Sequence, residues 1–223
     1  MKTIMITGAT GDIGIAIVSK LASGGNRIIA VVRNKEQCHT LESMNNIEIY
    51  EADVTERDDI ERLAHDIKGG VDWIIASHGY LDSQTDIIAQ KPEAIAKTFD
   101  VNTLSLFSIF QTFSSHLSQG MIFISSMAGI HPNGMIIAYS ASKAAVNAFA
   151  EALAKNQPRK TFIALCPGAV RGKMREKIGV TGGQDPMLVA DLVCDMMSEK
   201  SVYKSGDVVS IKNGIVKVEK QIS

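Results

Sequence analysis

Tyr139 and Lys143 form the pair of residues in this chain that most directly suggests a reaction. They stand four positions apart in a stretch with helical character, and Ser126 precedes them at the end of an apolar run. Side chains at positions i and i+4 share one face of a helix, so the phenol and the ammonium can point into one cleft. A fixed cation favours the phenolate and lowers the pKa of a tyrosine from about 10. Tyr139 could therefore exchange a proton with an alcohol or carbonyl oxygen that Ser126 hydrogen-bonds; the alternative is an exposed helical pair without a function.

The beginning of the chain carries a glycine-rich segment that is typical of a nucleotide-binding loop. An apolar run at 3–7 predicts a buried strand, and apolar residues at helical spacing in 15–22 predict a helix. Between them, Gly8, Gly11 and Gly14 would let the backbone approach a pyrophosphate beside the amides of the helix N-terminus. A dinucleotide fingerprint requires this order of strand, glycine turn and helix, although its general spacing is Gly-x-Gly-x-x-Gly. An ordinary tight turn is the alternative.

Apolar strand-like runs alternate with amphipathic helical stretches along the rest of the chain. This alternation predicts an α/β fold with a doubly wound parallel sheet of the Rossmann type, in a single domain over residues 1–223. The ligand cleft is expected at the carboxyl ends of the strands. Thr55 and Asp58 suggest a cap for the helix after the third strand. The expected strands are 3–7, 27–32, 47–50, 73–76, 121–125, 162–165 and 208–211, and the expected helices are 15–22, 57–67, 92–117, 139–155 and 186–198.

Together these motifs resemble those of the short-chain dehydrogenase/reductase family over nearly the whole chain. Thr7 to Gly14 resembles the cofactor loop of that family, and Asp53-Val54, Ala76 to Gly79 and Pro167-Gly168 resemble its later conserved segments. The resemblance implies hydride exchange with a nicotinamide cofactor. It also implies that Lys143 contacts the nicotinamide ribose and that Asn102 holds a water linking Lys143 to solvent. The implied catalytic set is Asn102, Ser126, Tyr139 and Lys143.

Charge at the end of the second strand indicates which cofactor is preferred. In a dinucleotide fold an acid at this place hydrogen-bonds the ribose of NAD, whereas an arginine accommodates the 2′-phosphate of NADP. Here Val32 is followed by Arg33 and Asn34, with no acid at the strand end. A guanidinium suits a phosphate, so NADP(H) is favoured over NAD(H), the alternative for Arg33 being a solvated loop cation. The expected cofactor-binding residues are Gly8, Thr10, Gly11, Asp12, Ile13, Gly14, Arg33, Asn34, Asp53, Val54, Gly79, Tyr139, Lys143, Pro167, Gly168 and Val170.

Three positions depart from the pattern of the family. Asp12 stands where its main branch has the second glycine of the loop, which brings a negative charge near the pyrophosphate. Ala76-Ser77-His78 replaces Asn-Asn-Ala, which bears on local geometry rather than on activity. Gly172 takes the place of a threonine that meets the nicotinamide carboxamide. Anchoring of the nicotinamide is then looser, or comes from the backbone around Val170.

Composition narrows the classes of partner. The formal net charge of −1 over 223 residues provides no basic field for nucleic acid. No apolar stretch approaches the ~18 residues that a membrane span needs, so a cytoplasmic protein that does not enter the membrane is expected. Cys38, Cys166 and Cys194 form no Cys-x-x-Cys pair, which fits a reducing compartment and argues against a metal site.

The sequence says less about the substrate. By resemblance, residues 170–185 form a short mobile lid over it, and His131 and Met135 are candidates to line the pocket. Four cations in the lid suggest an anionic substrate, contact with the cofactor phosphates, or simply solvated charges. They are Arg171, Lys173, Arg175 and Lys177.

Two functions and one assembly are expected. The first function is an NADP(H)-dependent enzyme acting on a small carbonyl or alcohol substrate; the alternative is a dinucleotide-binding regulatory or interaction protein without turnover. The helix expected at 139–155 is rich in alanine on several faces. With the family resemblance, this predicts a homodimer or homotetramer, the alternative being a helix buried within one chain.

Overall fold

One sheet of eight strands forms the centre of the computed structural model, which describes residues 1–221. The strands are β1 (Thr3–Thr7), β2 (Arg27–Val32), β3 (Ile47–Glu51), β4 (Val71–Ala76), β5 (Leu117–Ile124), β6 (Thr161–Pro167), β7 (Val208–Lys212) and β8 (Ile215–Lys220). Their order is β3-β2-β1-β4-β5-β6-β7-β8. All neighbours pair in parallel except β7 and β8, which are antiparallel. The predicted doubly wound sheet is confirmed, and its order reverses between β1 and β4, where such folds bind ligands.

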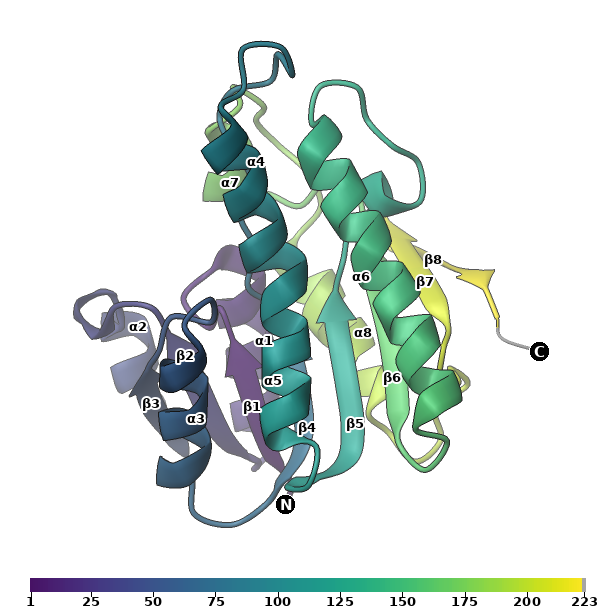
Figure 1. Ribbon diagram of the computed structural model, residues 1–223. Helices are drawn as coiled ribbons and strands as arrows, with labels where there is room; N and C mark the ends of the chain where they lie inside the picture. Colours follow the sequence, from purple (N-terminus) through teal and green to yellow (C-terminus); the bar gives the residue numbers. More distant parts are fainter. Residues whose placement is uncertain (222–223) are drawn as a thin grey trace.

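Helices cover both faces of the sheet. They are α1 (Asp12–Ser23), α2 (His39–Glu42), α3 (Arg57–Asp66), α4 (Pro92–Phe99), α5 (Ser105–Phe113), α6 (Ile137–Asn156), α7 (Lys173–Glu176) and α8 (Pro186–Met196). Figure 1 shows α3, α4, α5 and α6 in front of the sheet and α1, α2 and α8 behind it. Ile4 of β1 belongs to the core that contains Ile17 of α1, whereas Met5 belongs to the opposite core with Phe113 of α5. Because successive side chains enter opposite cores, the central strands are apolar throughout.

Residues 92–117 do not form the single helix expected from the sequence. A π-helical turn at Asp100–Leu104 separates α4 from α5, and the chain enters β5 at Leu117. Wide turns of this kind inside helices often mark functional sites. Here the turn carries Asn102.

One further expectation is corrected, and one strand was not predicted. Thr55 does not cap α3, because its hydroxyl donates to the Asp53 carboxylate and the helix begins at Arg57. β8 is not among the expected strands, since its exposed residues lack the apolar pattern of a buried strand. It forms the edge of the sheet beside β7.

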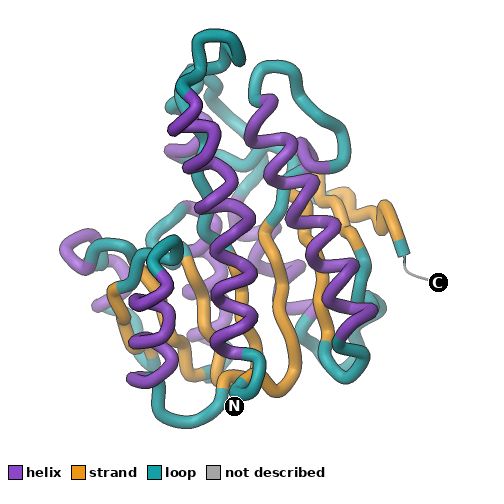
Figure 2. The backbone as a smooth tube through the Cα atoms, viewed as in Figure 1, coloured by secondary structure: helices purple, strands orange, loops and turns teal. Residues whose placement is uncertain are grey.

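The loops after β1, β4, β5 and β6 leave the same edge of the sheet because these strands are parallel. Figure 2 shows the loops after β4, β5 and β6 rising above the strands. They bring the glycine segment and residues 77–91, 125–136 and 168–185 to one end of the molecule. Within residues 1–221, no helix has both the length and the apolar character that crossing a bilayer requires.

Candidate active site

The glycine loop after β1 has the close backbone packing of a turn that holds a pyrophosphate. Gly8 has a φ of +66°, and a Cβ there would lie 2.6 Å from the Cα of His78. A Cβ on Gly14 would lie 2.1 Å from the carbonyl oxygen of Gly8. Gly11 precedes the 12-residue helix α1 without a side chain to cap its first amides, which leaves that end suited to an anion. The loop therefore fits the pyrophosphate of a dinucleotide.

Tyr139, Ser126 and Lys143 come together at the carboxyl end of β5. Ser126 follows the strand, and its Oγ accepts a hydrogen bond of 3.1 Å from the Ala128 amide. Tyr139 and Lys143 lie near the start of α6, with the Lys143 Nζ 5.7 Å from the centre of the Tyr139 ring. A Cβ on Gly129 would lie 2.6 Å from the Lys143 carbonyl carbon, so the turn after Ser126 packs directly on α6.

Burial sets the protonation of this site. It raises the pKa of Tyr139 to about 12, even though a hydrogen bond with Ser126 lowers that pKa. It also lowers the pKa of Lys143 to about 8, while the Lys143 Nζ donates to the Ile124 carbonyl at 2.8 Å. The expectation that Lys143 holds the pKa of Tyr139 low is therefore wrong, because burial raises that pKa and the hydrogen bond with Ser126, rather than the charge of Lys143, is what lowers it. At neutral pH the Tyr139 phenol is therefore protonated.

Asn102 fixes the backbone of Tyr80 from the π-helical turn. Its Oδ1 accepts from the Tyr80 amide at 2.7 Å, and its Nδ2 donates to the Tyr80 carbonyl and to the Ser142 Oγ, both at 2.9 Å. Both amide hydrogens are thus donated within the protein. A Cβ on Gly79 would lie 3.4 Å from the Asn102 Oδ1 and 3.7 Å from the Lys143 Nζ, so all three residues border one space. Sequence reasoning missed Tyr80 and Ser142, although Ser142 is the direct neighbour of Lys143.

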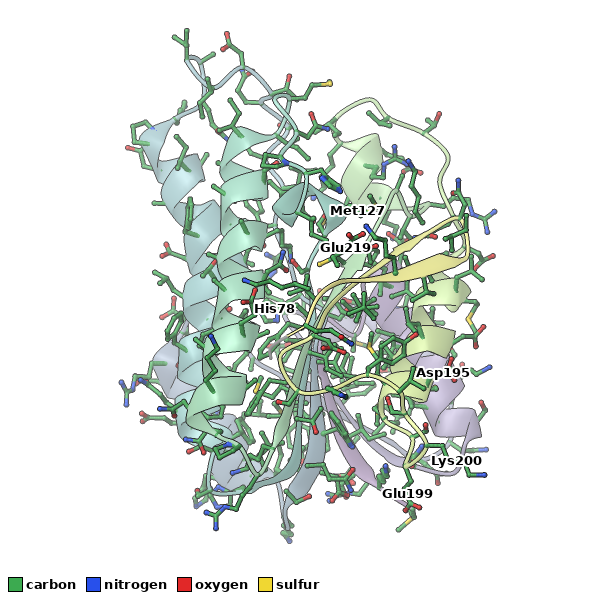
Figure 3. The ribbon with its side chains drawn as sticks, turned by 90° about the vertical axis from the view of Figure 1, so that its right-hand side faces the viewer. His78, Met127, Asp195, Glu199, Lys200 and Glu219 are labelled. Carbon is green, nitrogen blue, oxygen red and sulfur yellow. The ribbon has the colours of Figure 1, made fainter. Side chains whose placement is uncertain are left out.

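His78 braces the glycine loop against α5. Its ring nitrogens lie 2.6 Å from the Thr7 hydroxyl and 2.9 Å from the Ser105 hydroxyl. Burial, together with the charge of Lys143, lowers the pKa of His78 to about 3. The imidazole is therefore neutral; its position is labelled in Figure 3, and the residue is only partly buried.

The residues expected to hold the adenosine end lie where β2 and β3 finish. Arg33 is exposed directly after β2, and the Asn34 Oδ1 accepts from the Glu36 amide at 2.8 Å. Glu51, which pairs in register with Val32, was missed by sequence reasoning. Its carboxylate accepts from the Lys35 amide at 2.8 Å. An acid therefore does border the loop after β2, and only the pairing of β2 with β3 reveals it.

The backbone after β6 closes residues 170–185 into a tied loop. Gly168 donates to the Ile211 carbonyl of β7 at 2.7 Å. Val170 forms an isolated parallel bridge with Gln184. Arg171 pairs with Asp185 at 2.6 Å, and Arg175 donates to the Gly182 carbonyl. Two of the four cations therefore hold this loop together.

Asp12 reaches this loop from the start of α1. Its Oδ2 accepts a hydrogen bond of 2.9 Å from the Lys173 amide. The charge that the sequence places beside the pyrophosphate is thus hydrogen-bonded by a backbone donor of the 170–185 loop.

A small groove lies beside Tyr139, with a free volume of about 10 Å³ that would hold no more than one water molecule. It runs between residues 81–98 and 135–139. Met135 lines it as expected, whereas His131 does not line it and instead lies near enough to Glu219 of β8 to affect the pKa of that carboxyl. Its other lining residues are Leu81, Asp82, Gln84, Thr85, Ile87, Gln90, Thr98, Ile136, Ile137, Ala138 and Tyr139. A second hollow, between α3 and α5, includes Gly69 and His116 at the opposite edge of the sheet.

Comparison with known proteins agrees with this geometry. The family model described as short chain dehydrogenase matches residues 2–181. The chain belongs to the short-chain dehydrogenase/reductase family. It is therefore an oxidoreductase of that family.

Individual relatives cover most of the chain. It is 31% identical over 205 residues to a benzil reductase ((S)-benzoin forming) of Saccharomyces cerevisiae, a match that covers 83% of this chain and 78% of that protein. Its fold matches the 3-ketoacyl-(acyl-carrier-protein) reductase of Brucella melitensis complexed with NADH, with a TM-score of 0.86, 20% identity, and coverage of 96% and 97% of the two chains. It also matches ElxO with NADP bound, with a TM-score of 0.85, 20% identity, and coverage of 96% and 98%.

Proposed function

We propose that this chain interconverts a carbonyl and an alcohol with NADP(H), and that Tyr139 is its proton donor and acceptor. The observation that carries the proposal is the meeting of Tyr139, Ser126 and Lys143 at the strand ends that also hold the glycine loop. No packing requirement explains a lysine that is only 3% exposed in this position.

Each side chain of the site has a separate role in the reduction. NADP(H), when bound, supplies or accepts the hydride. Tyr139, protonated below its pKa of about 12, gives its proton to the oxygen of the carbonyl being reduced. Ser126 hydrogen-bonds the same oxygen, and the Lys143 ammonium offsets the negative charge that develops there. Asn102 positions the backbone at Tyr80, which borders the same space as Gly79.

The preference for NADP(H) rests on Arg33. Its exposed guanidinium follows β2, where the 2′-phosphate of NADP would lie. Glu51 acts in the opposite sense, although its carboxylate already accepts the Lys35 amide. Structures with this fold include complexes with NADH and with NADP, so they favour neither cofactor.

The groove, which has both apolar and polar walls, favours an uncharged substrate. Leu81, Ile87 and Met135 supply its apolar walls, and Asp82 would repel an anion. The name of the benzil-reducing relative is consistent with such a substrate. The cations of the 170–185 loop do not line this groove.

We also propose the assembly and location. A single domain would act in the cytoplasm as a homodimer or homotetramer. Leu104 and Phe107 are 55% and 45% exposed beside α6, whose exposed alanines include Ala141 and Ala148. Apolar surface of this kind favours burial against a second copy.

A reduction assay tests the function. NADPH oxidation is followed by absorbance with benzil, simple aryl ketones and a 3-oxoacyl thioester, and the uncharged ketones should turn over. Tyr139→Phe should lose at least about 10²-fold in kcat while binding NADPH like the wild type. Tyr203→Phe, far from the site, serves as the control. NADPH binding without turnover on any substrate would favour the non-catalytic alternative, and a fully active Tyr139→Phe would remove the proposed role.

A further inference from the structure

Two departures from the family pattern, far apart in sequence, lie in contact. Asp12 begins α1, and its Oδ2 accepts the Lys173 amide, which begins α7, at 2.9 Å across 161 positions of sequence. Lys173 follows Gly172, the second unusual residue. The glycine loop and the 170–185 loop are thereby joined by a charge-assisted hydrogen bond.

The space beside Gly172 is already taken by Asp12. A Cβ on Gly172 would lie 2.1 Å from the Asp12 Oδ2 and 2.4 Å from its Cγ. Gly172 also has a φ of +152°, which side-chain-bearing residues rarely adopt. With Asp12 in this position, the threonine of the family pattern cannot be accommodated at residue 172. Asp12 and Gly172 are therefore coupled, because the Asp12 carboxylate occupies the space that a side chain at residue 172 would need.

Helix α7 begins at the residue that Asp12 contacts, and it borders the active site. A Cβ on Gly79 would lie 3.6 Å from the Met174 Cε, on the same side as the Lys143 Nζ at 3.7 Å. Met174 belongs to α7, which begins at the Asp12 contact. The Asp12 contact thus adjoins a residue whose side chain reaches the space beside Lys143.

We propose that Asp12 is a positioning residue that ties the 170–185 loop to the glycine loop, and that this tie requires glycine at position 172. This proposal rests on the proposed function: the tie holds α7 beside the space for the nicotinamide, without the threonine of the family pattern. The tie is formed by protein groups alone, the Asp12 carboxylate and the Lys173 amide.

Limited tryptic cleavage tests the tie without any turnover. Arg171, Lys173 and Lys177 are exposed potential cleavage sites in the loop, and cleavage of a folded protein reports local opening. Asp12→Gly should raise the cleavage rate in the loop about three- to tenfold, the range that loss of one hydrogen bond predicts. Asp12→Asn keeps an acceptor oxygen and should recover most of the protection. Asp58→Gly, an exposed acid in the first turn of α3, is the matched control and should leave loop cleavage unchanged.

A double-mutant cycle tests the requirement for glycine. Gly172→Thr should increase loop cleavage and weaken NADPH binding, measured by fluorescence titration, several-fold. In the Asp12→Gly background, Gly172→Thr should change loop cleavage and NADPH binding by clearly smaller factors, because the carboxylate no longer occupies the space beside residue 172. The unfavourable φ penalises a side chain in both backgrounds, so only the coupling between the two sites reports the contact.

Two outcomes would overturn the tie: wild-type loop cleavage in Asp12→Gly, or additive effects of the two substitutions on cleavage. Either result can be obtained with a protein that reduces ketones normally. Conversely, a chain that binds no NADPH would contradict the proposed function, whereas the cleavage results would still support or contradict the tie.

Discussion

The Nδ1 atom of His78 lies 2.6 Å from the Thr7 hydroxyl. The other ring nitrogen lies 2.9 Å from the Ser105 hydroxyl, which itself donates to the Val101 carbonyl. Nε2 must therefore carry the proton, and Nδ1 accepts from Thr7. One neutral imidazole thus links β1 to α5.

This neutral state predicts that stability falls in acid. The pKa of His78 is about 3 in the folded chain and 6.5 ordinarily, so the unfolded chain binds more protons between these values. The contribution of His78 to stability is complete above pH 6.5 and is lost as pH falls towards 3, by up to about 1.4 kcal/mol per pH unit. Urea unfolding at several pH values should show a shallower acid loss for His78→Gln than for wild type. His65→Gln, at an exposed histidine, should follow the wild type; parallel profiles for His78→Gln and wild type would contradict the neutral brace.

The contacts of Asn102 predict a loss of stability on its removal. Asn102→Ala leaves the buried Ser142 hydroxyl and the Tyr80 amide without this partner. The free energy of unfolding should fall by about 1–3 kcal/mol. Asn156→Ala at the exposed end of α6 should change it by less than about 0.5 kcal/mol. Equal stability of Asn102→Ala and wild type in urea would show that these hydrogen bonds contribute little.

Cofactor preference is predicted to depend on two side chains of opposite charge. Arg33→Ala should weaken NADPH binding by about 1.5–3 kcal/mol, the contribution of a hydrogen bond to a charged group, and leave NADH binding nearly unchanged. Glu51→Gln should strengthen NADPH binding, because an acid that borders the same loop is removed. Arg57→Ala, an exposed arginine of α3, is the control. Tighter binding of NADH than of NADPH by the wild type would reverse the proposed preference.

The exposed apolar residues beside α6 predict a measurable assembly. Leu104→Glu and Ala148→Arg place charges on this surface and should shift the protein towards monomer in light scattering after size exclusion. Val202→Glu, at a residue 77% exposed on another part of the molecule, should not. A wild-type monomer at micromolar concentration would contradict the proposed oligomer.

Local patterns were readable from the sequence, whereas long-range contacts were not. The spacing of Tyr139 and Lys143 lies within one helix, so their shared location could be predicted. The bond between Asp12 and the Lys173 amide spans 161 positions, and no local pattern indicates it. The π-helical turn at Asp100–Leu104 likewise escapes prediction, because the segment has ordinary helical composition. β8 was missed for a different reason: as an exposed edge strand it buries too little to carry an apolar pattern.

The pKa of Lys143 predicts opposite pH trends for activity and stability. Burial lowers that pKa to about 8 from 10.5. Above pH 8 the folded enzyme loses the ammonium that offsets charge on the substrate oxygen, so kcat/KM for reduction should fall. Between pH 8 and 10.5 the unfolded chain binds more protons than the folded chain, so the contribution of Lys143 to stability should rise with pH.

Lys143→Arg and Lys143→Met separate the two effects. Arginine stays charged throughout this range, so any activity that Lys143→Arg retains should not fall above pH 8. Methionine carries no charge, so Lys143→Met should lose the alkaline rise in the free energy of unfolding. Rate profiles of reduction and urea unfolding from pH 7 to 10.5 measure both. A wild-type kcat/KM that stays level up to pH 10 would show that the ammonium does not act on the substrate oxygen, whatever the position of Tyr139.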